Sequence, residues 1–224
     1  MKLSHIAIPM LSGVLLLAIP QVNKANQVPT SESQQSLMTR IREFIGTQPR
    51  SVSVGGTRSA MGKQVCLLSP GPIRQSSKGS EILVVNATPD LVLGSKLNQI
   101  EIRSRNKVLW SEMGTSKKAI DGRISWPITP IKPRQRLQLG LRPRGTAGGD
   151  WARITLVGAS RAAMKTYQKT LKTSSGSSTA RLIAVNSAVK AKDQSKALAL
   201  LWAPLPSSDR TMKQLRADAL ASCP

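Results

Sequence analysis

Histidine is almost absent from this chain of 224 residues. The single one, His5, precedes an apolar run over residues 6–19, which a polar stretch follows. A short positive start, an apolar run and a polar stretch are typical of an export signal, which we expect over residues 1–25. Cleavage of that signal would leave no histidine, which excludes Ser-His-Asp and Cys-His catalysis and zinc sites that need imidazole.

The apolar run is shorter than the roughly 20 residues that a membrane-spanning helix needs. A buried helix is the other interpretation, and it suits an extreme N-terminus less well. Ala25 is acceptable before a cleavage site, whereas Asn23 is larger than the small residue usual at its position. We expect export to the periplasm or the cell exterior, with an N-terminal membrane anchor if the signal is retained.

Aromatic and acidic residues are also scarce. Aromatics make up 3% of the chain, so the core must be mostly aliphatic. Only 11 acidic residues oppose 33 basic ones, and the net charge of +22 predicts attraction to polyanions or anionic membranes. Glu101 alternates with Ile100 and Ile102, so we expect it to face solvent. Glycosidase chemistry needs two carboxylates that converge on the substrate, and the few acidic residues of this chain are scattered along the sequence. A carboxylate-based hydrolase is therefore the least favoured function.

Two cysteines, Cys66 and Cys223, complete the inventory of scarce residues. An oxidising destination favours a disulfide between them, which would tie the first domain to the C-terminus. The alternative is two unpaired thiols, one of them buried as a small hydrophobe.

The rest of the sequence divides into segments that differ in composition and hydrophobic pattern. Residues 26–50 indicate a flexible leader with a short helix over 36–45, and residues 51–158 hold short strands separated by turn residues. We expect a mainly β protein with an α appendage: an antiparallel Ig-like β-sandwich followed by a helical tail over 159–222. The tail contains two to three short helices after a first helix over 159–172. The expected strands are 64–68, 81–85, 99–104, 107–110, 120–126, 134–142 and 151–157.

Residues 55–64 read GGTRSAMGKQ and superficially suggest a phosphate-binding loop. That loop needs glycine where Thr57 stands and a hydroxyl residue where Gln64 stands, and it should open a helix. Since a strand is expected here, we predict a glycine turn and no nucleotide site. No cofactor is expected elsewhere.

The turn Gly55-Gly56-Thr57-Arg58, followed by Cys66 and Leu68-Ser69-Pro70, resembles the start of an exported cyanobacterial family of unknown function. This is the family called domain of unknown function nine-two-eight. Residues 124–127, 131–141 and 197–202 are similar to that family's proline-bearing turn, its strand and its helical end. The chain departs from the pattern at Leu137, where an aromatic is expected, and it lacks a second cysteine around 139–142. The resemblance therefore leaves Cys223 as the partner of Cys66, supports fold and export, and implies no activity.

Two basic rows are candidate anion-binding sites. Strand periodicity places Arg134, Arg136 and Arg142 on the face opposite the leucines, with Arg144 nearby. Helical periodicity aligns Arg161, Lys165 and Lys169, with Lys172 after them. Either row could instead be a solvated surface.

We therefore expect an exported, non-enzymatic interaction module with a protein partner in the cell envelope. The alternative is binding of an anionic polymer or anionic membrane surface through the basic strand face. Nucleic acid is not expected, because few aromatics accompany the basic residues as stacking platforms.

Overall fold

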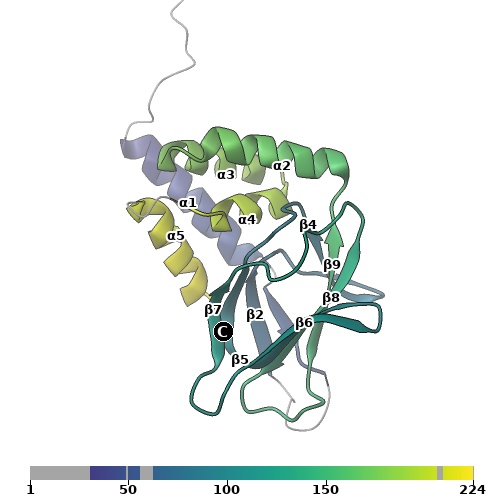
Figure 1. The fold of residues 1–224 in the computed structure, drawn as a ribbon. Helices are drawn as coiled ribbons and strands as arrows, with labels where there is room; N and C mark the ends of the chain where they lie inside the picture. Colours follow the sequence, from purple (N-terminus) through teal and green to yellow (C-terminus); the bar gives the residue numbers. More distant parts are fainter. Residues whose placement is uncertain (1–30, 49, 56–62, 206–208, 224) are drawn as a thin grey trace, which may run out of the picture.

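The fold, taken from a computed structural model, describes residues 31–48, 50–55, 63–205 and 209–223 (Figure 1). Within these residues the strands form one sheet, and the helices gather at one end of it (Figure 1). The helices are α1 (Ser31–Thr47), α2 (Arg161–Ser174), α3 (Ser178–Lys190), α4 (Gln194–Trp202) and α5 (Arg210–Ala221). The strands are β1 (Ser51–Ser53), β2 (Gln64–Ser69), β3 (Arg74–Ser76), β4 (Gly79–Val84), β5 (Leu91–Ser104), β6 (Lys107–Met113), β7 (Ile120–Ile124), β8 (Arg136–Pro143) and β9 (Ala152–Gly158).

Helices α2 to α5 each begin after a capping side chain. Ser160, Ser177, Asp193 and Asp209 accept a hydrogen bond from the backbone N–H three residues ahead. Such a bond satisfies one of the N–H groups that a helix start leaves without a partner. The predicted helices of the tail are confirmed, and the serine-rich break between the first two is confined to residues 175–177.

The sheet is mostly antiparallel. Its strand order is β1-β2-β5-β8-β9-β4-β3, while β6 and β7 each pair with β5. The pairing of β4 with β9 is parallel, so the sheet is mixed. The long strand β5 pairs with β2 and β7 through its first half and with β6 and β8 through its second half. Register shifts along β5 accompany this change of partners, and bulges of this kind bend a sheet.

Two hydrophobic cores result from this curled sheet. One core is formed by strand residues such as Leu67, Ile100, Leu139 and Leu156. The second core joins Cys66, Leu68 and Val92 of the sheet to buried residues of the helices. Strand β2 contributes alternate residues to both cores, which explains why its residues after Gln64 are buried.

The expected class, mostly β with a C-terminal helical segment, is confirmed. The finer architecture differs from a clear Ig-like sandwich, because the strands join one curled sheet and helices cover the second core. The N-terminal helix begins at Ser31, before the predicted start at residue 36, and it buries Ile41 and Ile45. The helix therefore includes residues 31–36, where the sequence predicts a leader. None of the described helices is long and apolar enough to cross a membrane.

Candidate functional site

The predicted basic face of β8 exists, but its arginines are engaged by neighbouring groups. Arg136 forms an ion pair with Glu81 of β4, and the guanidinium of Arg142 lies 5.7 Å from the centroid of the Trp151 ring. Arg144 donates to the carbonyl oxygen of Ser116 at 2.6 Å. Arg134 lies outside the strand, exposed in the preceding turn with a φ of 62°. The strand face is therefore partly neutralised by its own contacts.

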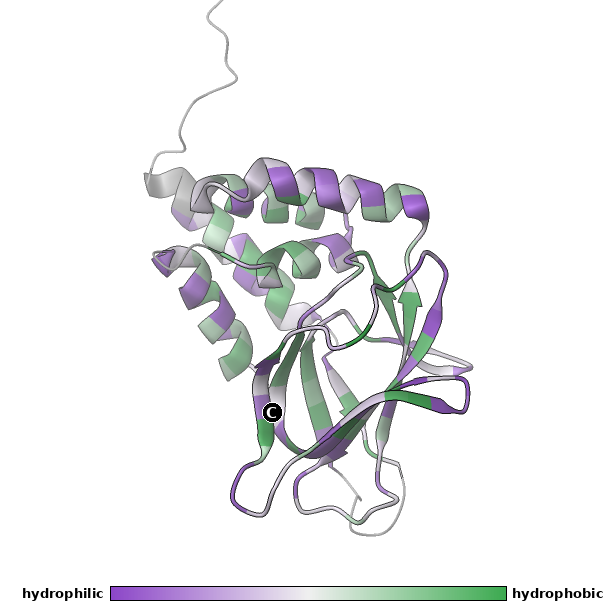
Figure 2. Cartoon of the chain, viewed as in Figure 1, coloured by the Kyte–Doolittle hydropathy of each residue, from purple (hydrophilic) through white to green (hydrophobic). Residues whose placement is uncertain are grey.

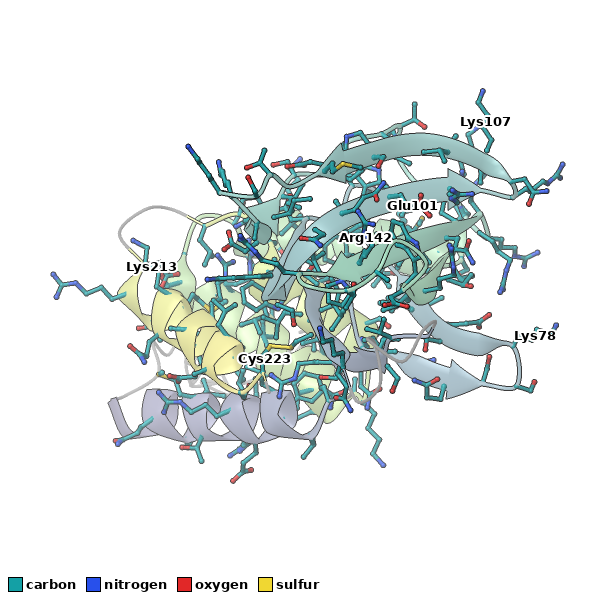
Figure 3. The ribbon with its side chains drawn as sticks, turned by 90° about the horizontal axis from the view of Figure 1, so that it is seen from below. Lys78, Glu101, Lys107, Arg142, Lys213 and Cys223 are labelled. Carbon is teal, nitrogen blue, oxygen red and sulfur yellow. A yellow bond between two sulfur atoms is a disulfide. The ribbon has the colours of Figure 1, made fainter. Side chains whose placement is uncertain are left out.

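Glu101 is buried, so the prediction that it faces solvent is wrong. It is 4% exposed, and its Oε1 accepts from Arg103 Nε at 2.7 Å and from Arg153 Nη1 at 3.4 Å. Opposite Glu101, the cross-strand position on β8 is Gly140, which leaves room for the carboxylate beside the Trp151 ring. Figure 3 labels Glu101 and Arg142 on this part of the sheet.

Trp151 is flanked by two cations. The guanidinium groups of Arg142 and Arg153 lie 5.7 and 5.5 Å from its ring centroid. Such contacts are attractive because the face of an aromatic ring carries partial negative charge. Ion pairs and ring contacts therefore hold together a cluster on the sheet, made up of Glu101, Arg103, Arg142, Trp151 and Arg153.

The basic row on α2 is different. Arg161, Lys165, Lys169 and Lys172 are all exposed, while Met164, Tyr167 and Ser174 on the opposite side are buried. Within the described residues none of these four side chains forms an ion pair. Figure 2 shows hydrophilic residues recurring along α2 at the edge of the molecule. The structure therefore brings this predicted row together on one solvent-facing side.

The C-terminal end of α4 is held by side chains from four other elements. A helix leaves its last four carbonyl groups without intrahelical partners. Arg181 of α3 donates to the carbonyl of Leu200, Arg216 of α5 to that of Leu201, and Arg123 of β7 to that of Trp202. The Tyr167 hydroxyl donates to the carbonyl of Ala199 at 3.4 Å.

This arrangement shifts the pKa values of its members. Burial raises the pKa of Tyr167 to about 12. Burial, with the neighbouring cations Arg123 and Arg181, lowers the pKa of Arg216 to about 10. The cations lie at the negative end of the α4 dipole, which offsets part of the cost of burying them.

Beside this helix end lies a cavity of about 410 Å³. Its walls come from the loop around Pro70, from β4 and the segment that follows it, from Trp126, and from α4. Two buried polar atoms on these walls, Ser195 Oγ and Trp202 Nε1, have no hydrogen-bond partner among the described residues. Sequence reasoning placed Trp202 on a helix but gave it no role. The available signal was the spacing of Ser195, Ala199 and Trp202, which puts two small residues and a tryptophan on one face.

The disulfide between Cys66 and Cys223 is confirmed, with the two Cα atoms 5.9 Å apart. Of the turn singled out in the sequence, Gly55 exchanges two backbone hydrogen bonds with Trp151, at 3.1 and 3.0 Å. Gly56, Thr57 and Arg58 lie outside the described residues, as does the expected export signal.

Comparison of the chain with protein-family models, with curated proteins and with solved structures finds no match. The resemblance to the exported cyanobacterial family therefore stays a prediction.

Proposed function

We propose that the protein is an exported, non-enzymatic interaction module of the cell envelope, and that it binds an anionic polymer or anionic membrane surface through α2. The observation that carries this proposal is the exposed basic row of Arg161, Lys165, Lys169 and Lys172, which has no ion-pair partner among the described residues. The apolar run at residues 6–19 supports export, and the disulfide suits an oxidising compartment.

Charge arithmetic supports an anionic partner. The chain has 33 basic and 11 acidic residues, so at least 22 cations (33 − 11) lack an acidic residue of their own. Arg136 and Arg142 of the strand face have internal partners, whereas the α2 row does not. The row extends over about 16 Å, at 1.5 Å per residue, which is long enough to meet several charges of a polymer or a lipid surface.

The test compares two triple variants with the same change in net charge. The first is Arg161→Glu, Lys165→Glu and Lys169→Glu on α2. The second is Lys78→Glu, Lys107→Glu and Lys117→Glu, which alters exposed residues away from α2. Binding is measured to vesicles that contain phosphatidylglycerol and to heparin as a soluble polyanion.

We expect the α2 variant to bind anionic vesicles about a hundredfold more weakly than the unaltered protein, because each basic residue near the surface contributes about 1 kcal/mol. Binding should also weaken as salt is added. Equal losses in the two triple variants would mean that net charge alone drives binding, and the α2 site would be wrong. Vesicles and heparin together tell whether the anionic partner is a membrane or a polymer.

A protein partner is the second candidate, and the edge strand β6 favours it. Val108, Leu109 and Met113 are 42%, 39% and 65% exposed, and all three lie on this one strand. In the described residues β6 pairs only with β5, so its other edge has unpaired backbone groups that can add a strand from a partner. Replacing Leu109 and Met113 by Lys should abolish capture of a specific envelope protein. Capture that survives these changes, or is lost in the α2 variant, would count against this edge.

A further inference from the structure

The cavity beside α4 follows one face of that helix. Ser195, Ala199 and Trp202 line it, and their spacing of four and three residues places them in one row. The row is about 10 Å long, since seven residues separate its ends. The residue in the middle is alanine, so the cavity is open along the row.

Both polar atoms are buried and lack partners. Ser195 is 3% exposed and Trp202 is 5% exposed, and neither Ser195 Oγ nor Trp202 Nε1 has a hydrogen bond in the described part of the chain. A second tryptophan of the cavity shows the contrast: Trp126 Nε1 donates to the carbonyl of Thr129 at 3.0 Å. Both atoms are covered by protein, so a molecule in the cavity cannot reach either of them and meets other atoms of these two residues instead.

The charge of the cavity defines the ligand further. Asp90 lines it, but its carboxylate is paired with Arg123, which also donates to the carbonyl of Trp202. Of the described residues, no lysine or arginine lines the cavity. A phosphate or another anion would therefore meet no free cation, and an uncharged ligand fits the site better.

We infer that the cavity binds an uncharged, mostly apolar small molecule. The ligand lies along Ala199, between the sheet and α4. The volume of about 410 Å³ lies in the range of small-molecule sites. This site is separate from the basic row on α2, and the inference does not rest on the proposed function.

The experiment titrates the protein with Nile red, an uncharged dye with a carbonyl oxygen whose fluorescence rises in apolar sites. Anilinonaphthalene sulfonate serves as the anionic comparison. Ala199→Leu fills the middle of the cavity with a residue that keeps the helix, and Ala217→Leu makes the same change on an exposed face of α5.

We expect saturable binding of Nile red with one site per chain, and weaker binding of the anionic dye. Ala199→Leu should abolish binding, whereas Ala217→Leu should leave it unchanged. The α2 charge-reversal variant should bind Nile red normally, which separates this site from the anion site.

Absence of saturable binding by the unaltered protein would overturn the inference and indicate a cavity filled by water. Equal binding by Ala199→Leu and Ala217→Leu would overturn it as well, since the dye would then lie elsewhere.

Discussion

Gly140 lies where β8 passes against the carboxylate of Glu101 and the ring of Trp151. A Cβ atom at this position would come within 2.9 Å of Glu101 Cγ and 3.1 Å of a ring carbon of Trp151. Both distances are shorter than ordinary contacts, and both neighbours are held by arginines. The glycine is thus the residue that allows a carboxylate and a tryptophan to cover the sheet together.

We predict that Gly140→Ala lowers the free energy of unfolding by about 1–3 kcal/mol, because the added methyl group displaces a packed neighbour. Urea denaturation followed by circular dichroism measures the change. Gly149→Ala is the matched control, since a Cβ there has nothing within 4 Å, and it should change the free energy by less than about 0.5 kcal/mol. Equal effects of the two substitutions would contradict the crowded geometry.

Tyr167, the only tyrosine of the chain, predicts an alkaline transition. Burial raises its pKa to about 12 in the folded protein, above the ordinary value of 10.0. The folded state holds the phenolic proton more tightly than the unfolded state does. The contribution of neutral Tyr167 to the free energy of unfolding is therefore complete below pH 10. This contribution is lost as the pH rises from 10 to 12, and the loss is about 3 kcal/mol.

The ultraviolet absorbance of tyrosinate measures this transition in a pH titration. The folded protein should ionise near pH 12, and the same chain in guanidinium chloride should ionise near pH 10. The folded form must be checked by circular dichroism at each pH. Reversible ionisation near pH 10 with an intact fold would contradict the burial of Tyr167.

At the scale of elements, α4 is defined by the groups that hold its end. Its apolar residues face both the helical core and the sheet, and its last carbonyl groups accept from Arg181, Arg216, Arg123 and Tyr167. These donors come from α3, α5, β7 and α2. The C-terminus of α4 is therefore the point where the helices and the sheet are joined by polar contacts, and it positions Trp202 in the cavity.

We predict that Arg216→Ala destabilises the protein by about 3 kcal/mol, because it leaves buried carbonyl groups of α4 without donors. It also removes the cation that lies 5.7 Å from the Trp202 ring centroid. Arg210→Ala, on the exposed side of the same helix, is the control and should cost less than about 0.5 kcal/mol. Thermal and urea unfolding measure the stability of the two variants. Similar stabilities would show that α4 does not need this donor.

The elements differ in how far the sequence predicts them. Serine and aspartate caps, with Gly158 and Pro204 at the boundaries, mark α2 and α4, and the turn at Arg105 and Asn106 marks the hairpin of β5 and β6. These signals are local, so they can be read from one segment. The curl of the sheet depends on β5 exchanging partners along its length, which no local pattern reveals.

The site residues divide in the same way. Helical spacing aligned the α2 row correctly, because exposure on an amphipathic helix follows from its own periodicity. The burial of Glu101 was missed, since it depends on the glycine opposite and on Trp151, which comes from another part of the chain. The cavity was missed for the same reason: its walls come from segments far apart in the chain.

At the scale of the whole molecule, the disulfide ties the sheet to the C-terminal helix within the second core. Cys66 lies on β2, whose residues serve both cores, and Cys223 follows α5 at the end of the described chain. Figure 3 shows the bond at the end of α5, next to the label of Cys223. Gly94 of β5 makes room for it, because a Cβ atom at this position would overlap the sulfur of Cys223.

We predict that the double variant Cys66→Ser and Cys223→Ser has a free energy of unfolding about 2–5 kcal/mol lower than that of the disulfide-bonded protein. The bond closes a loop with a sequence separation of 157 residues, and a long loop restricts the unfolded chain strongly. Hydrogen exchange of the backbone amides shows which helices and strands lose stability when the bond is removed. Amide protection should fall first in α5 and in α1, which packs against α5, while β8 and β9 keep theirs because Leu139 and Ile154 lie in the sheet's own core.

The two readouts separate two physical roles of the bond. A bond that acts only on the unfolded chain would lower protection evenly in every element that exchanges by global unfolding. A bond that also holds the helical layer to the sheet would lower it most where the covalent tie is lost. Uniform loss would therefore contradict the second role, and unchanged stability would contradict both. Because α5 supplies Arg216 to α4, selective loosening of α5 should also weaken the binding of Nile red beside Trp202, and this links the disulfide to the cavity.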